Sequence, residues 1–69
     1  MQLSARNQLR GTVKNIELGT IMATVVIELP GGQEVAATIT KASVENLGLK
    51  VGAPAMAVIK ATEVMVGVE

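Results

Sequence analysis

The sequence contains no phenylalanine, tyrosine or tryptophan, although 49% of its 69 residues are hydrophobic. Aromatic side chains bury the most surface per residue, so this core must be built from Val, Ile, Leu, Met and Ala. The chain is short, and it has neither cysteine for a disulfide nor histidine for a metal site. Such a small domain can still be stabilised by burying apolar surface against further copies of itself. We therefore expect a homo-oligomer.

The composition also excludes several classes of function. Without Cys or His, the side chains that most often act as nucleophiles or acid–base catalysts are missing. Six basic and six acidic residues give a net charge of zero, and no aromatic ring is present to stack on bases. No apolar run reaches the roughly 18 to 20 residues that span a membrane, and residues 1–6 lack a secretion-signal pattern. We expect a cytoplasmic binding protein that is not an enzyme, with no nucleic-acid and no membrane partner.

Apolar residues alternate with a period of two, the strand period, over most of the chain. The alternation is clear in residues 21–29, 35–39 and 64–68, whereas residues 55–60 form an almost unbroken apolar run typical of a strand covered on both faces. In residues 7–18 the apolar phase changes near Lys14-Asn15, which predicts a β-bulge or bend. These five segments predict five strands.

Turn and cap residues separate the predicted strands. Leu18-Gly19-Thr20 predicts a tight connection, and Pro30-Gly31-Gly32 predicts a hairpin turn. Between Thr40 and Gly48 the pattern fits one or two helical turns, with Thr40 as N-cap and Gly48 at the C-terminal end. The predicted fold is all-β: a small five-stranded OB-like barrel with one short helix between strands three and four.

Two cationic residues and the predicted helix start carry the candidate chemistry. Arg6 lies in the polar cluster Ser4-Ala5-Arg6-Asn7-Gln8, and Lys60 ends the apolar run. Thr40 and Ser43 add hydroxyls and free backbone N–H groups at the positive end of the helix dipole. Arginine offers a planar fork of donors and lysine a compact charge, and both suit oxyanions. The residues therefore predict an oxyanion site, provided that the fold brings them together. The same residues also fit ordinary structural roles. Arg6 can simply be solvated, Lys60 can extend its charged end from an apolar strand into water, and Thr40 and Ser43 can act only as helix caps.

The sequence shows no pattern for a metal held directly by protein ligands. The carboxylates are dispersed, and Met22, Met56 and Met65 have no soft partner nearby, so they are expected to pack. No two carboxylates have the spacing of a catalytic dyad, and no organic cofactor motif is present.

Three segments resemble the molbindins, the small Mop-type molybdate-binding proteins of the TOBE domain family. They are Ser4-Ala5-Arg6-Asn7-Gln8-Leu9-Arg10-Gly11, Thr40-Lys41-Ala42-Ser43-Val44-Glu45-Asn46-Leu47-Gly48-Leu49 and Ala57-Val58-Ile59-Lys60-Ala61-Thr62-Glu63-Val64-Met65. The resemblance covers essentially the whole chain and implies a single Mop/TOBE-type domain over residues 1–69. It also implies a hexamer, built as a trimer of dimers, that binds molybdate or tungstate between subunits for storage and buffering.

The resemblance also implies the ligand residues. At the matching positions these are Ser4, Arg6, Thr40, Ser43, Lys60 and, through its backbone N–H, Ala61. Several relatives have serine where this chain has Ala61, so a side-chain hydroxyl is lost there. The family has a second kind of site near a three-fold axis, for which no motif here assigns residues. Two alternatives stay open: a molybdate-sensing module acting on a partner protein, and an OB-fold nucleic-acid binder.

Overall fold

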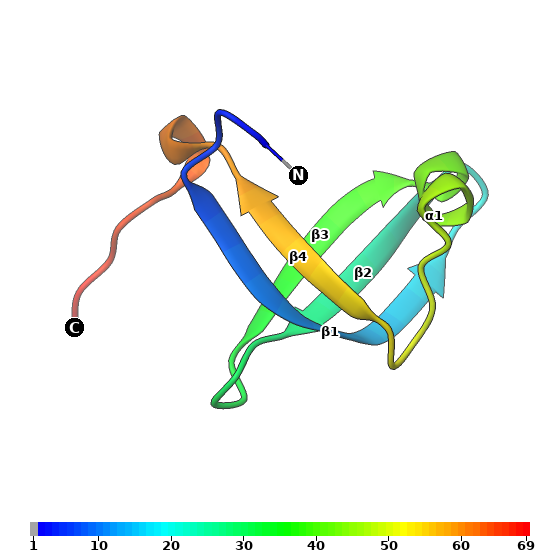
Figure 1. The fold of residues 1–69 in the computed structure, drawn as a ribbon, viewed down its shortest axis with the longest axis horizontal. Helices are drawn as coiled ribbons and strands as arrows, with labels where there is room; N and C mark the ends of the chain where they lie inside the picture. Colours follow the sequence, from blue (N-terminus) through cyan, green and yellow to red (C-terminus); the bar gives the residue numbers. More distant parts are fainter. Residues whose placement is uncertain (1) are drawn as a thin grey trace.

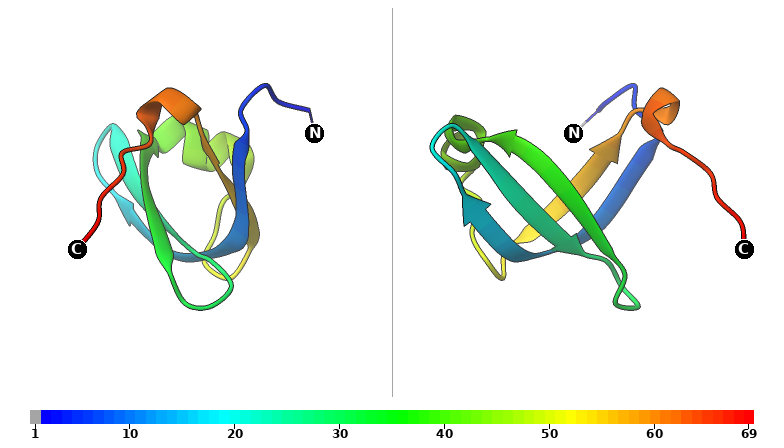
Figure 2. Two further views of the ribbon diagram at one scale, coloured as in Figure 1. Left: turned by 90° about the vertical axis from the view of Figure 1, so that its left-hand side faces the viewer. Right: turned by 180° about the vertical axis from the view of Figure 1, so that it is seen from behind.

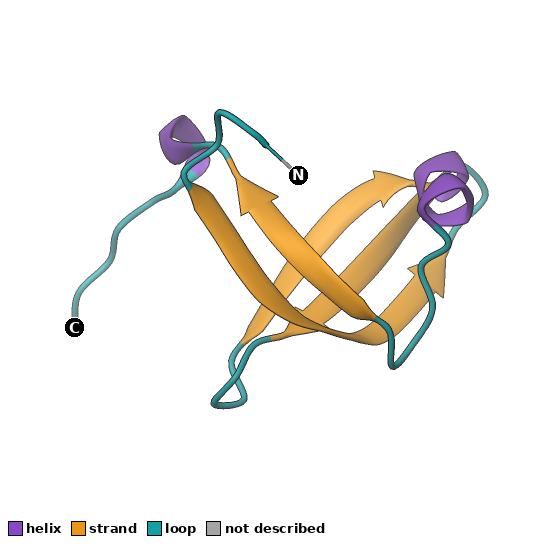
Figure 3. Ribbon diagram, viewed as in Figure 1, coloured by secondary structure: helices purple, strands orange, loops and turns teal. Residues whose placement is uncertain are grey.

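The protein is described by a computed structural model covering residues 2–69, and its centre is one strongly curled antiparallel sheet (Figure 1). Four strands lie in the order β3-β2-β1-β4. Figure 3 shows one helix at the end of β3 and a short 3₁₀ turn after β4. The elements are β1 (Asn7–Leu18), β2 (Met22–Glu28), β3 (Glu34–Thr40), α1 (Lys41–Leu47), β4 (Pro54–Ile59) and η1 (Ala61–Glu63).

The long strand β1 bends in its middle, and this bend produces the curl of the sheet. Val13 pairs with Ile27 and Asn15 pairs with Val26, so Lys14 is an extra residue without a partner on β2. This β-bulge lies at the predicted position, and a bulge bends a strand and increases its twist. As a result, the first half of β1 pairs with β4 and the second half pairs with β2.

The predicted hairpin turn and helix are confirmed. Gly31 and Gly32 have φ angles of 96° and 95°, which are accessible to glycine at little cost, and they connect β2 to β3. In α1, Thr40 is the N-cap, and Gly48 closes the helix in the left-handed conformation with φ of 63°. Both termini of this seven-residue helix therefore have the caps that the sequence predicts.

The core is small and wholly aliphatic. Within residues 2–69 no polar or charged side chain is buried, so the core needs no side-chain hydrogen bond. The helix contributes Val44, which packs against the sheet. The buried residues are Val13, Ala23, Val25, Ile27, Val44 and Ala57.

The predicted fifth strand is wrong for the single chain. Residues 64–69 form no strand, and Met65, Val66 and Val68 are almost fully exposed. Alternating apolar residues mark a segment with a face to bury, but a strand also needs a neighbouring backbone to bond to. No pairing joins this tail to its own sheet, and in Figure 1 it leads away from the strands. The structure is therefore mostly β with one short helix, and has four strands instead of a closed five-stranded barrel. No helix between residues 2 and 69 is long and apolar enough to cross a membrane.

Candidate functional site

The segments before β1 and after β4 lie side by side. Because Asn7 pairs with Ile59 at the end of the β1–β4 ladder, the residues flanking that pair are brought together. A shallow pocket of about 270 Å³ lies between the two segments. Its lining residues are Ser4, Ala5, Arg6, Lys60, Ala61 and Thr62. Four of the predicted ligand residues thus share one pocket, and we call Ser4, Arg6, Lys60 and Ala61 the cationic half-site.

The cationic half-site has the chemistry of an anion pocket. Arg6 and Lys60 both line it, no carboxylate does, and neither cation forms an ion pair with any residue from 2 to 69. Ala61 is the first residue of η1, so its N–H has no acceptor within that turn. The Glu63 N–H donates to the Lys60 carbonyl at 2.8 Å, which fixes the backbone beside the pocket. Two cations and hydroxyl and N–H donors therefore surround a space with no competing negative charge.

Thr62 also lines this pocket, although it is absent from the predicted ligand set. The turn η1 brings it back toward the opening segment. Its hydroxyl adjoins Ala61, whose own side chain offers no donor. The signal that points to Thr62 is its place in Lys60-Ala61-Thr62, but local sequence does not show that the chain turns there.

The remaining predicted ligands, Thr40 and Ser43, form a second cluster that we call the hydroxyl half-site. The Ser43 N–H donates to Thr40 Oγ1 at 3.0 Å, and the two hydroxyl oxygens are 2.7 Å apart. The Lys41 N–H donates to the Ile21 carbonyl at 2.7 Å, which ties the helix start to the β1–β2 turn. Thr40 lines an open concavity of about 460 Å³ together with Thr20, Ile21, Lys41, Ala42 and Glu45, whereas Ser43 is not among its lining residues.

The two half-sites lie at opposite ends of the folded molecule. The right-hand view of Figure 2 shows α1 at one end of the molecule and the N-terminal segment with η1 at the other. The pockets beside the half-sites share no residue. Within one chain, four of the six predicted ligand residues lie in the cationic half-site and two lie in the hydroxyl half-site. The single chain therefore does not bring all six into one site.

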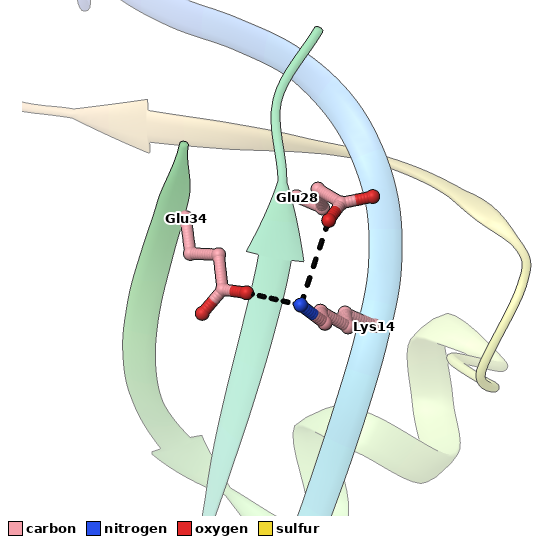
Figure 4. A network of polar contacts seen from close by, with 3 residues as sticks. All are labelled: Lys14, Glu28 and Glu34. Atoms are coloured by element: carbon pink, nitrogen blue, oxygen red, sulfur yellow. Dashed lines mark hydrogen bonds and ion pairs between the residues drawn. The ribbon is translucent and has the colours of Figure 1, made fainter. Parts of the chain in front are cut away.

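A separate ion cluster lies across three neighbouring strands (Figure 4). The Lys14 Nζ bonds to a Glu34 carboxylate oxygen and lies 3.5 Å from Glu28 Oε2. The hydrogen bond to Glu34, with the charges of Glu34 and Glu28, raises the pKa of Lys14 above its ordinary value. All three side chains are about half exposed, so the cluster links strand surfaces and encloses no space. Nowhere in residues 2–69 do three Asp, Glu, His or Cys side chains converge on a possible metal position.

The TOBE domain model matches residues 3–66 of the chain. A probable molybdenum-pterin-binding protein of Haemophilus influenzae is 52% identical over 69 residues, covering 100% of both chains. The chain belongs to the TOBE domain family, among the Mop-type molybdenum-pterin-binding proteins.

Solved structures of this family have the same fold. MopII from Clostridium pasteurianum superposes with a TM-score of 0.92 and 45% identity, covering 97% of this chain and 100% of that one. The cytoplasmic molybdate-binding protein ModG, solved with molybdate bound, has a TM-score of 0.85 and 56% identity. The match covers 88% of this chain and 43% of ModG. The curled four-stranded sheet and short helix are therefore those of Mop proteins.

Proposed function

We propose that this protein binds molybdate or tungstate in the cytoplasm, storing and buffering the oxyanion at sites between subunits of a homohexamer. The observation that carries the proposal is the division of the proposed ligand residues into a cationic and a hydroxyl half-site at opposite ends of the folded molecule. A second copy is needed to place the two kinds of half-site around one ion. Molybdate-bound ModG and the molybdenum-pterin-binding relatives support molybdate as the ligand.

The half-sites suit a dianion without needing a catalytic group. Arg6 and Lys60 together carry the charge that neutralises molybdate, so burial at a subunit boundary leaves no unpaired charge. Ser4, Thr40 and Ser43 add hydroxyl donors, and none of the six ligand residues is a carboxylate. Hydrogen phosphate carries a proton that needs an acceptor, so it is disfavoured. We therefore propose binding, and not catalysis, as the activity.

The surface of the single chain supports assembly. β3 and β4 are the outer strands of the sheet, and an outer strand presents unpaired backbone N–H and C=O groups. Residues 64–68 alternate apolar side chains and have no partner in their own chain. In the oligomer, the tail of one copy supplies the fifth strand of another copy's OB-like barrel. This exchange joins two copies into a dimer, and three such dimers, joined through a second kind of contact, make the trimer of dimers.

Substitution of the cations tests the ligand set by calorimetric titration with molybdate. Arg6→Ala and Lys60→Ala should each weaken binding at least tenfold, since losing a charge-assisted contact costs about 1.5–3 kcal/mol. Lys14→Ala and Lys50→Ala remove the same charge outside both half-sites and should leave the affinity nearly unchanged. Equal losses from all four variants would show that binding depends only on diffuse surface charge.

Mixed oligomers test whether each site is shared between copies. Arg6→Ala chains lack a working cationic half-site, and Thr40→Ala chains lack a working hydroxyl half-site. When the two variants are unfolded together and refolded, random assortment should restore about a quarter of the sites, those that combine an intact half from each chain. Recovery of high-affinity stoichiometry in the mixture, and not in either variant alone, is the expected result. If the mixture binds no better than the variants, or light scattering finds a stable monomer, the shared site is wrong.

A further inference from the structure

Ile21 is an exposed apolar residue beside the hydroxyl half-site. It is 72% exposed in the turn between β1 and β2, and it helps to line the same concavity as Thr40. The Lys41 N–H holds its carbonyl at 2.7 Å, so its backbone is fixed to the start of α1. The side chain is thus presented to solvent from an anchored position.

The cationic half-site also has an apolar neighbour. The Val64 N–H donates to the Ala61 carbonyl at 3.3 Å, and the chain then continues into Met65 and Val66, which are 94% and 91% exposed. This apolar segment therefore starts within a few residues of Lys60. Each half-site is followed or flanked by exposed hydrophobic surface that its own chain leaves uncovered.

From this arrangement we infer that Ile21 of one copy packs against residues 64–66 of a second copy, forming an apolar rim around the shared oxyanion. The inference rests on the proposed function. An ion that accepts hydrogen bonds of about 3 Å from both half-sites holds them a few ångströms apart, which brings Ile21 of one copy close to the point where the apolar segment of the other copy begins. The partner is a second copy because only another cationic half-site brings this segment with it. The rim excludes water, which strengthens the attraction between the ion and the two cations.

Serine substitution at Ile21 tests the rim on the intact protein. Ile21→Ser should weaken molybdate binding about tenfold and shift dissociation of the oligomer to higher chain concentration, because an apolar contact between copies is lost. Val51→Ser is the matched control: Val51 is 63% exposed in the loop between α1 and β4, and lines neither half-site pocket. Equal behaviour of the two variants in titration and sedimentation would overturn the inference.

A double-mutant cycle identifies the partner segment. Ile21→Ser is combined with Met65→Ser and, separately, with Val66→Ser, and molybdate affinity is measured for every variant. Contacting residues give non-additive losses, so at least one pair should lose less than the sum of its single effects. Additive losses in both pairs would overturn the contact. Arg6→Ala in the same assay separates the two proposals: if it weakens binding and Ile21→Ser does not, the rim is wrong and the oxyanion site stands. If neither variant affects binding, the proposed function itself fails.

Discussion

The Ser43 backbone N–H donates a hydrogen bond of 3.0 Å to Thr40 Oγ1, and the hydroxyl oxygens of the two residues lie 2.7 Å apart. Thr40 thereby acts as the N-cap of α1 and as half of the hydroxyl half-site. One of the two hydroxyls donates to the other across this 2.7 Å contact, so one hydroxyl proton of the pair is left to donate to a ligand. A capping interaction thus orients a ligand donor.

Alanine substitution should separate these two roles. Ser43→Ala keeps the backbone N–H, so the cap survives and only molybdate affinity falls. Thr40→Ala removes both the N-cap hydrogen bond and the Thr40 hydroxyl. It should therefore lower the unfolding free energy by about 1 kcal/mol and also lower the affinity for molybdate. Thr40→Asn restores the cap without restoring the threonine donor. Urea unfolding at one chain concentration and molybdate titration measure the two quantities, and wild-type affinity in Ser43→Ala would remove Ser43 from the site.

Local sequence signals predict most of the fold. The β-bulge near Lys14, the hairpin glycines and both caps of α1 depend on residues close together in the chain, and each is confirmed. The prediction of a fifth strand was wrong for the single chain. Residues 64–68 have the apolar period of a strand, but no strand of the same chain pairs with them. Periodicity reports which face of a segment is apolar, and it carries no information about which strand lies beside it.

The candidate site, too, could be predicted from the sequence only in part. The residue types of Arg6 and Lys60 suggest an anion pocket, but only the Asn7–Ile59 pairing brings the two segments together. That pairing joins residues far apart in sequence, which no local pattern specifies. The separation of Thr40 from this pocket depends on the bend of β1 and the length of the sheet, so it too appears only in three dimensions.

Gly11 lies where two strands approach too closely for any side chain. A Cβ atom there would lie 2.3 Å from the Glu28 carbonyl oxygen and 2.7 Å from Ile27 Cγ2. Gly11→Ala should therefore displace β2 from β1 and lower the unfolding free energy by about 1–3 kcal/mol, as overpacking does. Gly67→Ala is the control, since no atom lies within 4 Å of its added methyl group. Equal urea midpoints for the two variants would show that the sheet accommodates a methyl group at Gly11.

The Lys14 cluster should make a contribution to stability that disappears at alkaline pH. Its pKa is raised above the ordinary value of 10.5, chiefly by the hydrogen bond to Glu34. When the pKa of a lysine is higher in the folded than in the unfolded state, its charged form stabilises the folded protein. This stabilisation is fully present at pH values below the unfolded-state pKa, and it is lost as the pH rises through the folded-state pKa. Lys14→Gln should lower the melting temperature slightly at pH 8, and the difference should vanish well above pH 10.5. Lys50→Gln, outside any ion pair in residues 2–69, controls for general lysine titration. A difference that persists at high pH would assign the effect of Lys14 to packing.

Selectivity and salt dependence should distinguish an enclosed site from a merely basic surface. In the proposed site, Ser4, Arg6, Thr40, Ser43 and Lys60 bind the ion through directional hydrogen bonds inside a subunit boundary, and such bonds would be shielded from solvent ions. An exposed patch would act through Coulomb attraction that salt screens, with a Debye length of about 10 Å at 0.1 M. Molybdate affinity should therefore fall only modestly as sodium chloride is raised. Equimolar sulfate should compete poorly because of its size, and phosphate because of its proton. Competition titrations at two ionic strengths measure both effects. If sulfate displaces molybdate at comparable concentration and affinity collapses with salt, the half-sites do not enclose the ion.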